Sequence, residues 1–365
     1  MKKILFLLFT VCSISVVLSQ ESHENIIWKD AKQAPFNLVG FEWMDQDSVY
    51  RRLPVHSKWK IPKAVNNLAN NTAGGQLRFI TNSNKIHLDV VLTNASGMYH
   101  MPATAQSGFD IYVQKDGRQK YLKTANFSAS DIHYKTIIDA GNYNKKQQFT
   151  INFPLYNGVE SVRIGIEKNA TLEKPNSFKR TGKIVIYGTS ITQGGCVSRP
   201  GMVYSNILSR KLDVEFVNLG FSGNGKGEPE LAHIISEISG VSMLLLDYEA
   251  NASATIQNTI EDFVTILRAK FPKTPIVIMS KIRYAYNVEG SDSYKQLISN
   301  RDFQKELVYS RKNKGDTNIY FLDGSTVLGD DYDECTVDGV HPTDLGSYRI
   351  ADALLQKIQG ILKSE

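Results

Sequence analysis

The spacing of hydrophobic residues changes near residue 180. Before that point, short runs rich in β-branched and aromatic residues are separated by turn residues, and several alternate apolar with polar positions. The clearest of these runs cover residues 75–80, 86–92, 109–113 and 162–166. No long helical pattern interrupts them, and Asp116-Gly117 is typical of a tight hairpin turn. The pattern predicts an all-β domain over residues 20–178, most simply a β-sandwich.

From residue 183 onward, strand-like runs alternate with helical patterns. The predicted strands cover residues 183–188, 214–220, 241–247, 275–281 and 319–323. The predicted helices cover residues 203–212, 230–239, 255–271, 293–312 and 344–362. This alternation predicts a second, α/β domain over residues 179–365, with a parallel sheet covered by helices on both faces. A ligand site is then expected beyond the carboxyl ends of the strands.

Residues 1–19 form a separate segment. Two lysines precede an apolar run that ends in small residues, which is the pattern of a secretory signal. The alternative is a buried strand or a membrane anchor, but the run is shorter than the ~20 residues that span a bilayer. We therefore expect an exported protein, periplasmic or extracellular. No later stretch of the sequence is apolar enough to span a membrane.

Composition and charge narrow the function classes. The 365 residues are 42% hydrophobic and 22% charged, which is typical of globular proteins and excludes a disordered or fibrous chain. The formal net charge is +5, and it falls to +3 when Lys2 and Lys3 leave with the signal. No run of five like charges occurs, so a nucleic-acid partner is not expected.

Ser190 lies directly after the first predicted strand of the α/β domain, in Gly188-Thr189-Ser190. A glycine there lets the chain turn sharply, which exposes the serine hydroxyl at the sheet edge beside free backbone N–H groups. The alternative is a serine that only caps the next helix. A serine nucleophile also needs a base and a group that orients the base.

Asp338 and His341 fit those two roles, because they are three residues apart on a tight turn before the last helix. Only one other histidine, His233, lies in the α/β half, and its mid-helix position favours packing. A solvent-facing cap residue is the alternative for His341. These residues predict an orienting carboxylate, a base and a nucleophile.

An acyl-transfer site also needs donors for the charge that develops on a carbonyl oxygen. The backbone of Gly223 and the side chain of Asn251 follow the second and third strands, where such donors belong. The alternative is that both lie in ordinary loops. No phosphate loop, His-Glu-x-x-His or Cys-x-x-Cys occurs, and no metal site is predicted.

Together these segments resemble the SGNH (GDSL-type) hydrolase superfamily. Gly188-Thr189-Ser190 stands for its Gly-Asp-Ser block, and residues 218–223 resemble its glycine block. Asp338-Gly339-Val340-His341-Pro342 matches its Asp-x-x-His block. The usual Gly-x-Asn-Asp block is replaced by residues 247–251, so Asp247 competes with Asn251 for that place. Gly108-Phe109-Asp110-Ile111-Tyr112 resembles the Gly-x-Asp-Leu-Tyr signature of a β-sandwich that precedes the catalytic domain in a secreted bacterial subgroup.

The resemblance implies a three-layer α/β/α, flavodoxin-like catalytic domain behind a jelly-roll-like sandwich. It implies a cofactor-free serine esterase in which the N–H groups of Ser190 and Gly223 and the Asn251 amide hold the oxyanion. The implied substrate is a short acyl, most simply acetyl, ester on an oligo- or polysaccharide. The alternatives are a lipase or phospholipase, and a non-catalytic carbohydrate-binding protein with a degenerate hydrolase domain.

Four further residues carry expectations that depend on this site. Arg199 and Tyr204 follow the nucleophile loop and could contact sugar hydroxyls; the alternative is a surface ion pair and a core tyrosine. Cys196 and Cys335 lie close in sequence to the nucleophile and to Asp338. If the site assembles, their loops are neighbours, and a disulfide between them is expected in an oxidising compartment. The alternative is two buried free thiols.

Overall fold

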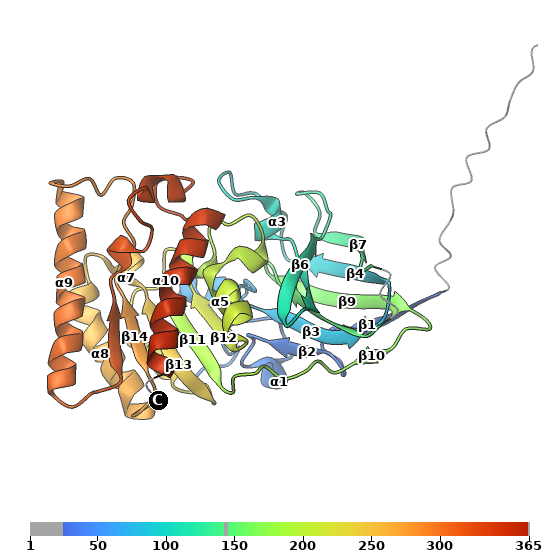
Figure 1. Cartoon of the computed structure of the whole chain (residues 1–365), viewed down its shortest axis with the longest axis horizontal. Coiled ribbons are helices and arrows are strands. Elements are labelled where there is room, and N and C mark those ends of the chain that lie inside the picture. Colours follow the sequence, from blue (N-terminus) through green and yellow to red (C-terminus); the bar gives the residue numbers. More distant parts are fainter. Residues whose placement is uncertain (1–24, 142–144, 364–365) are drawn as a thin grey trace, which may run out of the picture.

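The computed structural model describes residues 25–141 and 145–363. The predicted export signal over residues 1–19 lies outside these ranges. Two regions sit side by side: a β-rich N-terminal region and an α/β C-terminal region that carries the long helices (Figure 1). Among the described residues, no helix is long and apolar enough to cross a membrane.

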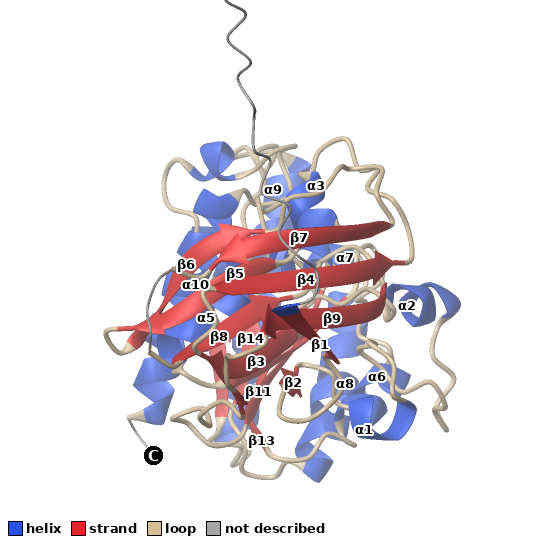
Figure 2. Ribbon diagram, turned by 90° about the vertical axis from the view of Figure 1, so that its right-hand side faces the viewer, coloured by secondary structure: helices blue, strands red, loops and turns tan. Residues whose placement is uncertain are grey.

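The N-terminal region is a sandwich of two antiparallel sheets (Figure 2). The first sheet has the order β1-β9-β4-β7, formed by Ile26–Asp30, Val159–Glu167, Lys85–Leu92 and His133–Asp139. The second has the order β10-β3-β8-β5-β6, formed by Leu172–Glu173, Gln76–Thr81, Gln147–Asn152, Asp110–Lys115 and Arg118–Thr124, and β2 (Asn37–Val39) also pairs with β3. Its helices are short: α1 (Met44–Asp47), α2 (Lys63–Leu68) and α3 (Ala103–Gln106).

The sandwich core confirms the alternation seen in the sequence. Inward-facing side chains from both sheets form one buried cluster, which includes Leu77, Phe79, Leu88, Ile111 and Ile164. The predicted hairpin turn joins β5 to β6, with positive φ at both Asp116 (52°) and Gly117 (77°). Such φ values are what a two-residue hairpin loop requires.

The C-terminal region is built on a five-stranded parallel sheet in the order β12-β11-β13-β14-β15. Its strands are β11 (Lys183–Gly188), β12 (Glu215–Gly220), β13 (Val241–Asp247), β14 (Ile276–Met279) and β15 (Ile319–Leu322). Its helices are α4 (Ser190–Gln193), α5 (Tyr204–Leu212), α6 (Pro229–Ile235), α7 (Glu249–Ala252), α8 (Ile256–Lys270), α9 (Asp292–Asn313) and α10 (Asp344–Leu362). The 2-1-3-4-5 strand order is the flavodoxin-like order.

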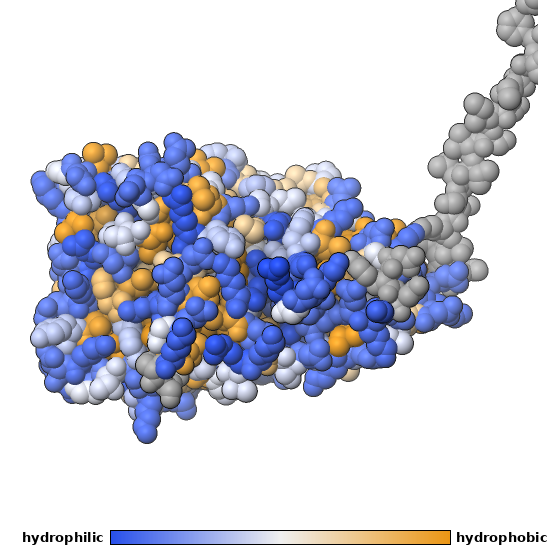
Figure 3. All heavy atoms as spheres, viewed as in Figure 1, coloured by the Kyte–Doolittle hydropathy of each residue, from blue (hydrophilic) through white to orange (hydrophobic). Residues whose placement is uncertain are grey.

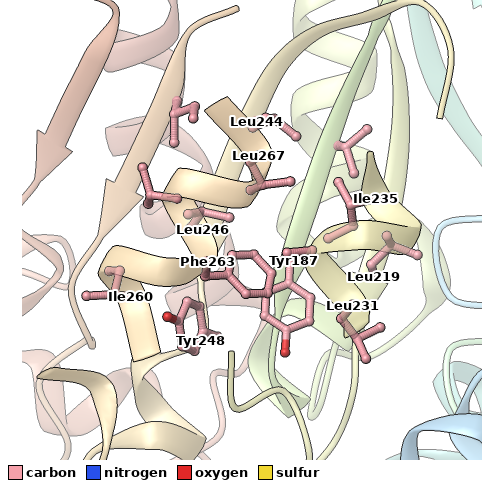
Figure 4. Close-up of a cluster of buried hydrophobic side chains, with 14 of the residues drawn as sticks. Tyr187, Leu219, Leu231, Ile235, Leu244, Leu246, Tyr248, Ile260, Phe263 and Leu267 are labelled. Atoms are coloured by element: carbon pink, nitrogen blue, oxygen red, sulfur yellow. The ribbon is translucent and has the colours of Figure 1, made fainter. Parts of the chain in front are cut away.

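Helices cover both faces of this sheet, which confirms the three-layer prediction. On one face, Tyr187, Leu219 and Leu246 pack against Leu231 of α6 and Phe263 of α8 (Figure 4). On the other face, the strand residues between these positions pack against α5 and α10. Because both faces are buried, the strands are continuous apolar runs, and this made them easy to find in the sequence.

A buried arginine from the N-terminal region binds the C-terminal sheet. Arg52 is 1% exposed and donates from Nη1 to the carbonyl oxygens of Asn218 and Gly220 in β12. Its other nitrogens donate to the carbonyl oxygens of Leu68 and Asn71. Burial lowers the pKa of Arg52 to about 9.

On the face of the molecule shown in Figure 3, hydrophobic side chains are scattered among hydrophilic ones.

Candidate active site

Ser190 is the first residue of α4, directly after β11. The turn between them has no room for a side chain at Gly188, because a Cβ there would overlap Thr192 Oγ1 of α4 and lie 2.6 Å from the carbonyl oxygen of Asp247. Thr189 caps the helix, and its hydroxyl accepts a hydrogen bond from the Ile191 N–H. Ser190 therefore occupies a fixed position at the carboxyl edge of the sheet, with 8% of its surface exposed.

His341 and Asp338 come to the same place from the loop before α10. Ser190 Oγ lies 2.9 Å from His341 Nε2, and His341 Nδ1 lies 2.7 Å from Asp338 Oδ2. The second carboxylate oxygen, Oδ1, accepts from the backbone N–H groups of Val340 and His341. Burial opposes ionisation of Asp338, but these hydrogen bonds hold its pKa below the ordinary value. An ionised Asp338 keeps the proton of His341 on Nδ1, which leaves Nε2 to accept the Ser190 hydroxyl.

Three possible oxyanion donors lie around the serine. Within the described residues, no hydrogen bond uses the backbone N–H of Ser190 or of Gly223. Gly223 has φ of 70°, a backbone conformation that favours glycine. Asn251, on α7, donates from Nδ2 to the carbonyl oxygen of Phe221 at 3.2 Å, so its amide lies beside the loop of Gly223.

Asp247 was the alternative to Asn251 in the block that replaces Gly-x-Asn-Asp, but its side chain binds residues of α4 and α5. It is 5% exposed, and its Oδ2 accepts from Thr192 Oγ1 at 2.9 Å and from Tyr204 Oη at 2.6 Å. Burial raises the pKa of Asp247 to about 7, against the opposing effect of the two hydroxyls. Asp247 thus binds α4, the helix that begins at Ser190, which leaves Asn251 as the candidate donor.

The N-terminal region holds the same helix from the other side. Tyr156 Oη donates to the carbonyl oxygen of Ser190 at 3.0 Å, and Gln193 Nε2 donates to the carbonyl oxygen of Leu155 at 3.0 Å. Sequence reasoning did not identify Tyr156. It lies in an irregular loop of the sandwich region, where no spacing pattern points to the other domain.

Arg199 and Tyr204 do not occupy the substrate positions expected for them. Arg199 Nη1 lies 2.7 Å from Asp110 Oδ2 and 2.6 Å from Tyr112 Oη, so it joins the two regions through an ion pair. Tyr204 is 1% exposed and donates to Asp247. A buried tyrosine and a paired arginine correct the expectation of sugar contacts. Asp110 and Tyr112 are the Asp and Tyr of the Gly-x-Asp-Leu-Tyr signature.

The structure contradicts the expected Cys196–Cys335 disulfide: both cysteines are free, and both are buried. Their loops are neighbours, since the Cys196 N–H donates to the carbonyl oxygen of Pro342. The thiols have different surroundings: Cys335 Sγ lies 3.7 Å from the carbonyl oxygens of Leu328 and Asp331, whereas Cys196 Sγ faces two histidines. Burial raises the pKa of Cys196 to about 12, so without a bound metal its thiol is protonated at neutral pH.

His233 packs as its sequence position indicated. Its ring stacks on Trp59 with 3.9 Å between centroids and 6° between planes. Trp59 Nε1 also donates to Glu237. Trp59 is therefore a contact between the two regions.

Two exposed tyrosines lie on loops that touch the loop of His341. Tyr99, from the sandwich, is 92% exposed and packs on His100, whose ring lies 5.6 Å from that of His341. Tyr286 is 54% exposed, and the neighbouring Ala285 N–H donates to the carbonyl oxygen of Gly339. Each region therefore carries an exposed tyrosine on a loop that contacts the loop of His341.

Each of the two regions matches a known protein family. Residues 181–359 match the GDSL-like lipase/acylhydrolase family, and residues 26–172 match the N-terminal region of SGNH-hydrolase-type esterases. No curated protein matches the sequence.

Several solved structures align over most of the chain. A protein of Bacteroides ovatus described as a GDSL-like lipase is 31% identical, with a TM-score of 0.85, covering 93% of this chain and 98% of that one. The salicylyl-acyltransferase SsfX3 from a tetracycline biosynthetic pathway is 18% identical, with a TM-score of 0.73, covering 92% and 97%. A family two carbohydrate esterase from Cellvibrio japonicus is 16% identical, with a TM-score of 0.57, covering 93% and 98%. The acyltransferase and the carbohydrate esterase are so distant in sequence that their similarity to this chain shows a shared fold only.

Proposed function

This chain belongs to the GDSL-like lipase/acylhydrolase family of SGNH-type esterases, and we propose that it hydrolyses short acyl esters on carbohydrates with Ser190 as the nucleophile. One observation carries the proposal: the continuous hydrogen-bond chain from Ser190 Oγ through His341 to Asp338, at 2.9 and 2.7 Å. An intact chain also argues against a degenerate, purely binding protein.

In the proposed mechanism, His341 Nε2 takes the hydroxyl proton while Ser190 Oγ attacks the ester carbonyl carbon. The N–H groups of Ser190 and Gly223 and the Asn251 amide donate to the oxyanion. Collapse of the tetrahedral intermediate breaks the ester bond, and the leaving alcohol takes its proton from His341. Water, activated by the same imidazole, then attacks the acyl-enzyme and releases the acid. Asp338 remains ionised throughout and stabilises the imidazolium.

Two features of the site support a short acyl group on a sugar. Tyr99 and Tyr286 offer exposed aromatic faces near His341, and such faces pack well against sugar rings. The loops that carry Ser190 and His341 contain only short helical segments, among them α4 (Ser190–Gln193) and one turn at Tyr332–Cys335. A long acyl chain would therefore gain little by binding there. The same fold in a family two carbohydrate esterase is consistent with this substrate class.

The test is a chain-length series of activated esters together with acetate release from a panel of acetylated oligosaccharides. We expect kcat/KM to fall steeply beyond about four acyl carbons, because each additional methylene would otherwise contribute about 0.8 kcal/mol when buried. Ser190→Ala serves as the blank. A kcat/KM that rises through about eight carbons, with no acetate released from any glycan, would instead favour a lipase.

Export is part of the proposal and has its own test. If residues 1–19 are a cleaved signal, the protein recovered from the cell exterior or periplasm begins at Gln20. Sequencing of its N-terminus decides the point. A protein recovered in the cytoplasm that still carries Lys2 and Lys3 would contradict export.

A further inference from the structure

Three potential metal ligands from separate parts of the chain meet beside the catalytic serine. His100 lies in the sandwich loop between β4 and α3, Cys196 in the loop after α4, and His341 in the loop before α10. One ligand atom from each, two imidazole nitrogens and a thiol sulfur, lie within 4.8 Å of one another. Neither His100 nor Cys196 has a role in the proposed ester hydrolysis.

The surroundings of His100 leave its ring unsatisfied. His100 Nδ1 is buried and has no hydrogen-bond partner among the described residues. Its Nε2 lies 4.0 Å from Asp338 Oδ2, beyond hydrogen-bond distance. The ring of Tyr99 packs on the His100 ring, with 4.5 Å between centroids and 30° between planes. A buried polar nitrogen without a partner is costly, and a cation bound at Nδ1 would satisfy it.

We propose that His100, Cys196 and His341 form an inhibitory binding site for a thiophilic divalent cation, with Zn²⁺ as the best fit. One thiolate and two imidazoles are a ligand set that Zn²⁺ prefers, and a water completes the tetrahedron. With Zn–N near 2.0–2.1 Å and Zn–S near 2.3 Å, tetrahedral ligand atoms lie about 3.3–3.6 Å apart. The present separations of up to 4.8 Å thus require the side chains to approach by at most about 1.5 Å.

Metal binding at this site blocks the proposed reaction for a geometric reason. Both ring nitrogens of His341 are already used, Nδ1 by Asp338 and Nε2 by Ser190. A cation bound to either nitrogen displaces Asp338 or Ser190 from His341. The imidazole can then no longer act as the base for Ser190. The thiol proton of Cys196 passes to the buffer when the sulfur binds. This inhibitory consequence rests on the proposed function, whereas the binding itself does not.

Binding is tested without any enzyme assay by titrating the metal-free full chain with Co²⁺, a spectroscopic substitute for Zn²⁺. We expect a thiolate-to-cobalt charge-transfer band and tetrahedral d–d bands that saturate at one equivalent. The charge-transfer band disappears in Cys196→Ala and persists in Cys335→Ala, which removes the other buried free cysteine. We expect His100→Gln to weaken Co²⁺ and Zn²⁺ binding by at least about 10-fold to 100-fold, because even the loss of a residue that only hydrogen-bonds to a metal ligand has an effect of this size. His133→Gln is the matched control.

Inhibition is the second measurement. Zn²⁺ lowers the esterase activity of the wild-type protein reversibly, and a chelator restores it. Cys196→Ala and His100→Gln, each compared with its own metal-free activity, require at least about tenfold more Zn²⁺ for the same inhibition. Cys335→Ala responds as the wild type does.

The outcomes separate this inference from the proposed function. Ser190→Ala keeps all three ligands and is expected to give the full Co²⁺ spectrum, so the site can be tested even in a protein without esterase activity. A wild-type protein that hydrolyses esters but gives no thiolate–cobalt band overturns the site and leaves the function standing. Zn²⁺ inhibition that is equal in wild type and Cys196→Ala also overturns the site, because the cation would then act elsewhere.

Discussion

The two regions of the molecule contribute to the site in different ways. The C-terminal region carries every group assigned to the chemistry: Ser190, His341 and Asp338, with Gly223 and Asn251 beside them. The N-terminal region carries none, yet its side chains hold the loops around the serine. Tyr156 binds the Ser190 carbonyl oxygen, and Arg199 on the nucleophile loop is held by the sandwich.

The difference shows how a β-sandwich can matter to a reaction that it does not perform. A parallel sheet brings the ends of its strands to one edge, but the loops that leave this edge need support from outside. Here Asp110 Oδ2 accepts from both Arg199 Nη1 and the Gly201 N–H, and its Oδ1 accepts from Asn152 Nδ2. A carboxylate with no exposed surface thus fixes the segment that follows the nucleophile.

The largest expected effect is confined to the C-terminal region. Ser190→Ala and His341→Ala should each lower kcat/KM for an activated acetate ester by roughly 10⁴-fold or more, because the serine and its base act as a unit. The double variant should be little worse than either single one. Steady-state kinetics checks this, with unfolding midpoints to show that each variant folds.

Ser222→Ala is the matched control, since Ser222 lies in the next loop but outside the hydrogen-bond chain. It should keep most of the activity. If Ser190→Ala folds and turns over normally while Ser222→Ala is inactive, the assignment of the nucleophile is wrong.

Asn251→Ala should give the next largest effect. Its amide is proposed to contact charge that exists only in the transition state, so kcat should fall by roughly 10²-fold with little change in KM. Asp247→Asn provides the comparison, because Asp247 is bound to Thr192 and Tyr204. A rise in KM with unchanged kcat in Asn251→Ala would make it a substrate contact.

The sequence predicted the C-terminal region better than the N-terminal one. The strands Lys183–Gly188 and Val241–Asp247 and the helix Asp344–Leu362 have the expected bounds, because buried parallel strands and long amphipathic helices leave strong patterns. The one-turn helices α4 and α7 are too short to show a period. The strand order of the sandwich was also out of reach, since a strand's own alternation does not specify its neighbour.

Side-chain partners were predictable only where sequence and function coincide. Asp338 and His341 are three residues apart and carry complementary chemistry, so their pairing could be anticipated. Arg199 and Asp110 are 89 positions apart, and nothing local distinguishes a domain contact from a sugar contact. The free thiols teach the same lesson: Cys196 and Cys335 lie on neighbouring loops, but the direction of each thiol depends on packing.

The role of the sandwich can be tested through Arg199. Arg199→Ala leaves the carboxylate of Asp110 buried without its cation, which should lower the free energy of unfolding by about 3 kcal/mol. The same change should lower kcat severalfold, because it loosens the loop after the nucleophile. Urea unfolding and kinetics check the two effects.

Lys295→Ala is the control, because its ion pair with Asp292 is exposed and should contribute less than about 1 kcal/mol. In the double variant Asp110→Asn/Arg199→Gln neither member of this pair is left as an unpaired charge, so part of the stability should return. A stable, fully active Arg199→Ala would show that the sandwich does not support the nucleophile loop through this pair.

The last expected effect is on the pH dependence of stability, and it concerns Asp247, which binds α4 from β13. Its pKa is raised by burial from the ordinary 3.8 to about 7. Between these values the folded protein keeps a proton that the unfolded chain has lost, so the free energy of unfolding should decline as pH rises from about 4 to 7. Asp247→Asn carries no such proton, and its stability should fall less over that window, while the fully exposed Asp292→Asn should follow the wild type. Urea unfolding at several pH values measures the difference. Identical slopes for wild type and Asp247→Asn would mean that folding does not shift the pKa of Asp247, so that an ionised carboxylate holds α4 over most of this window.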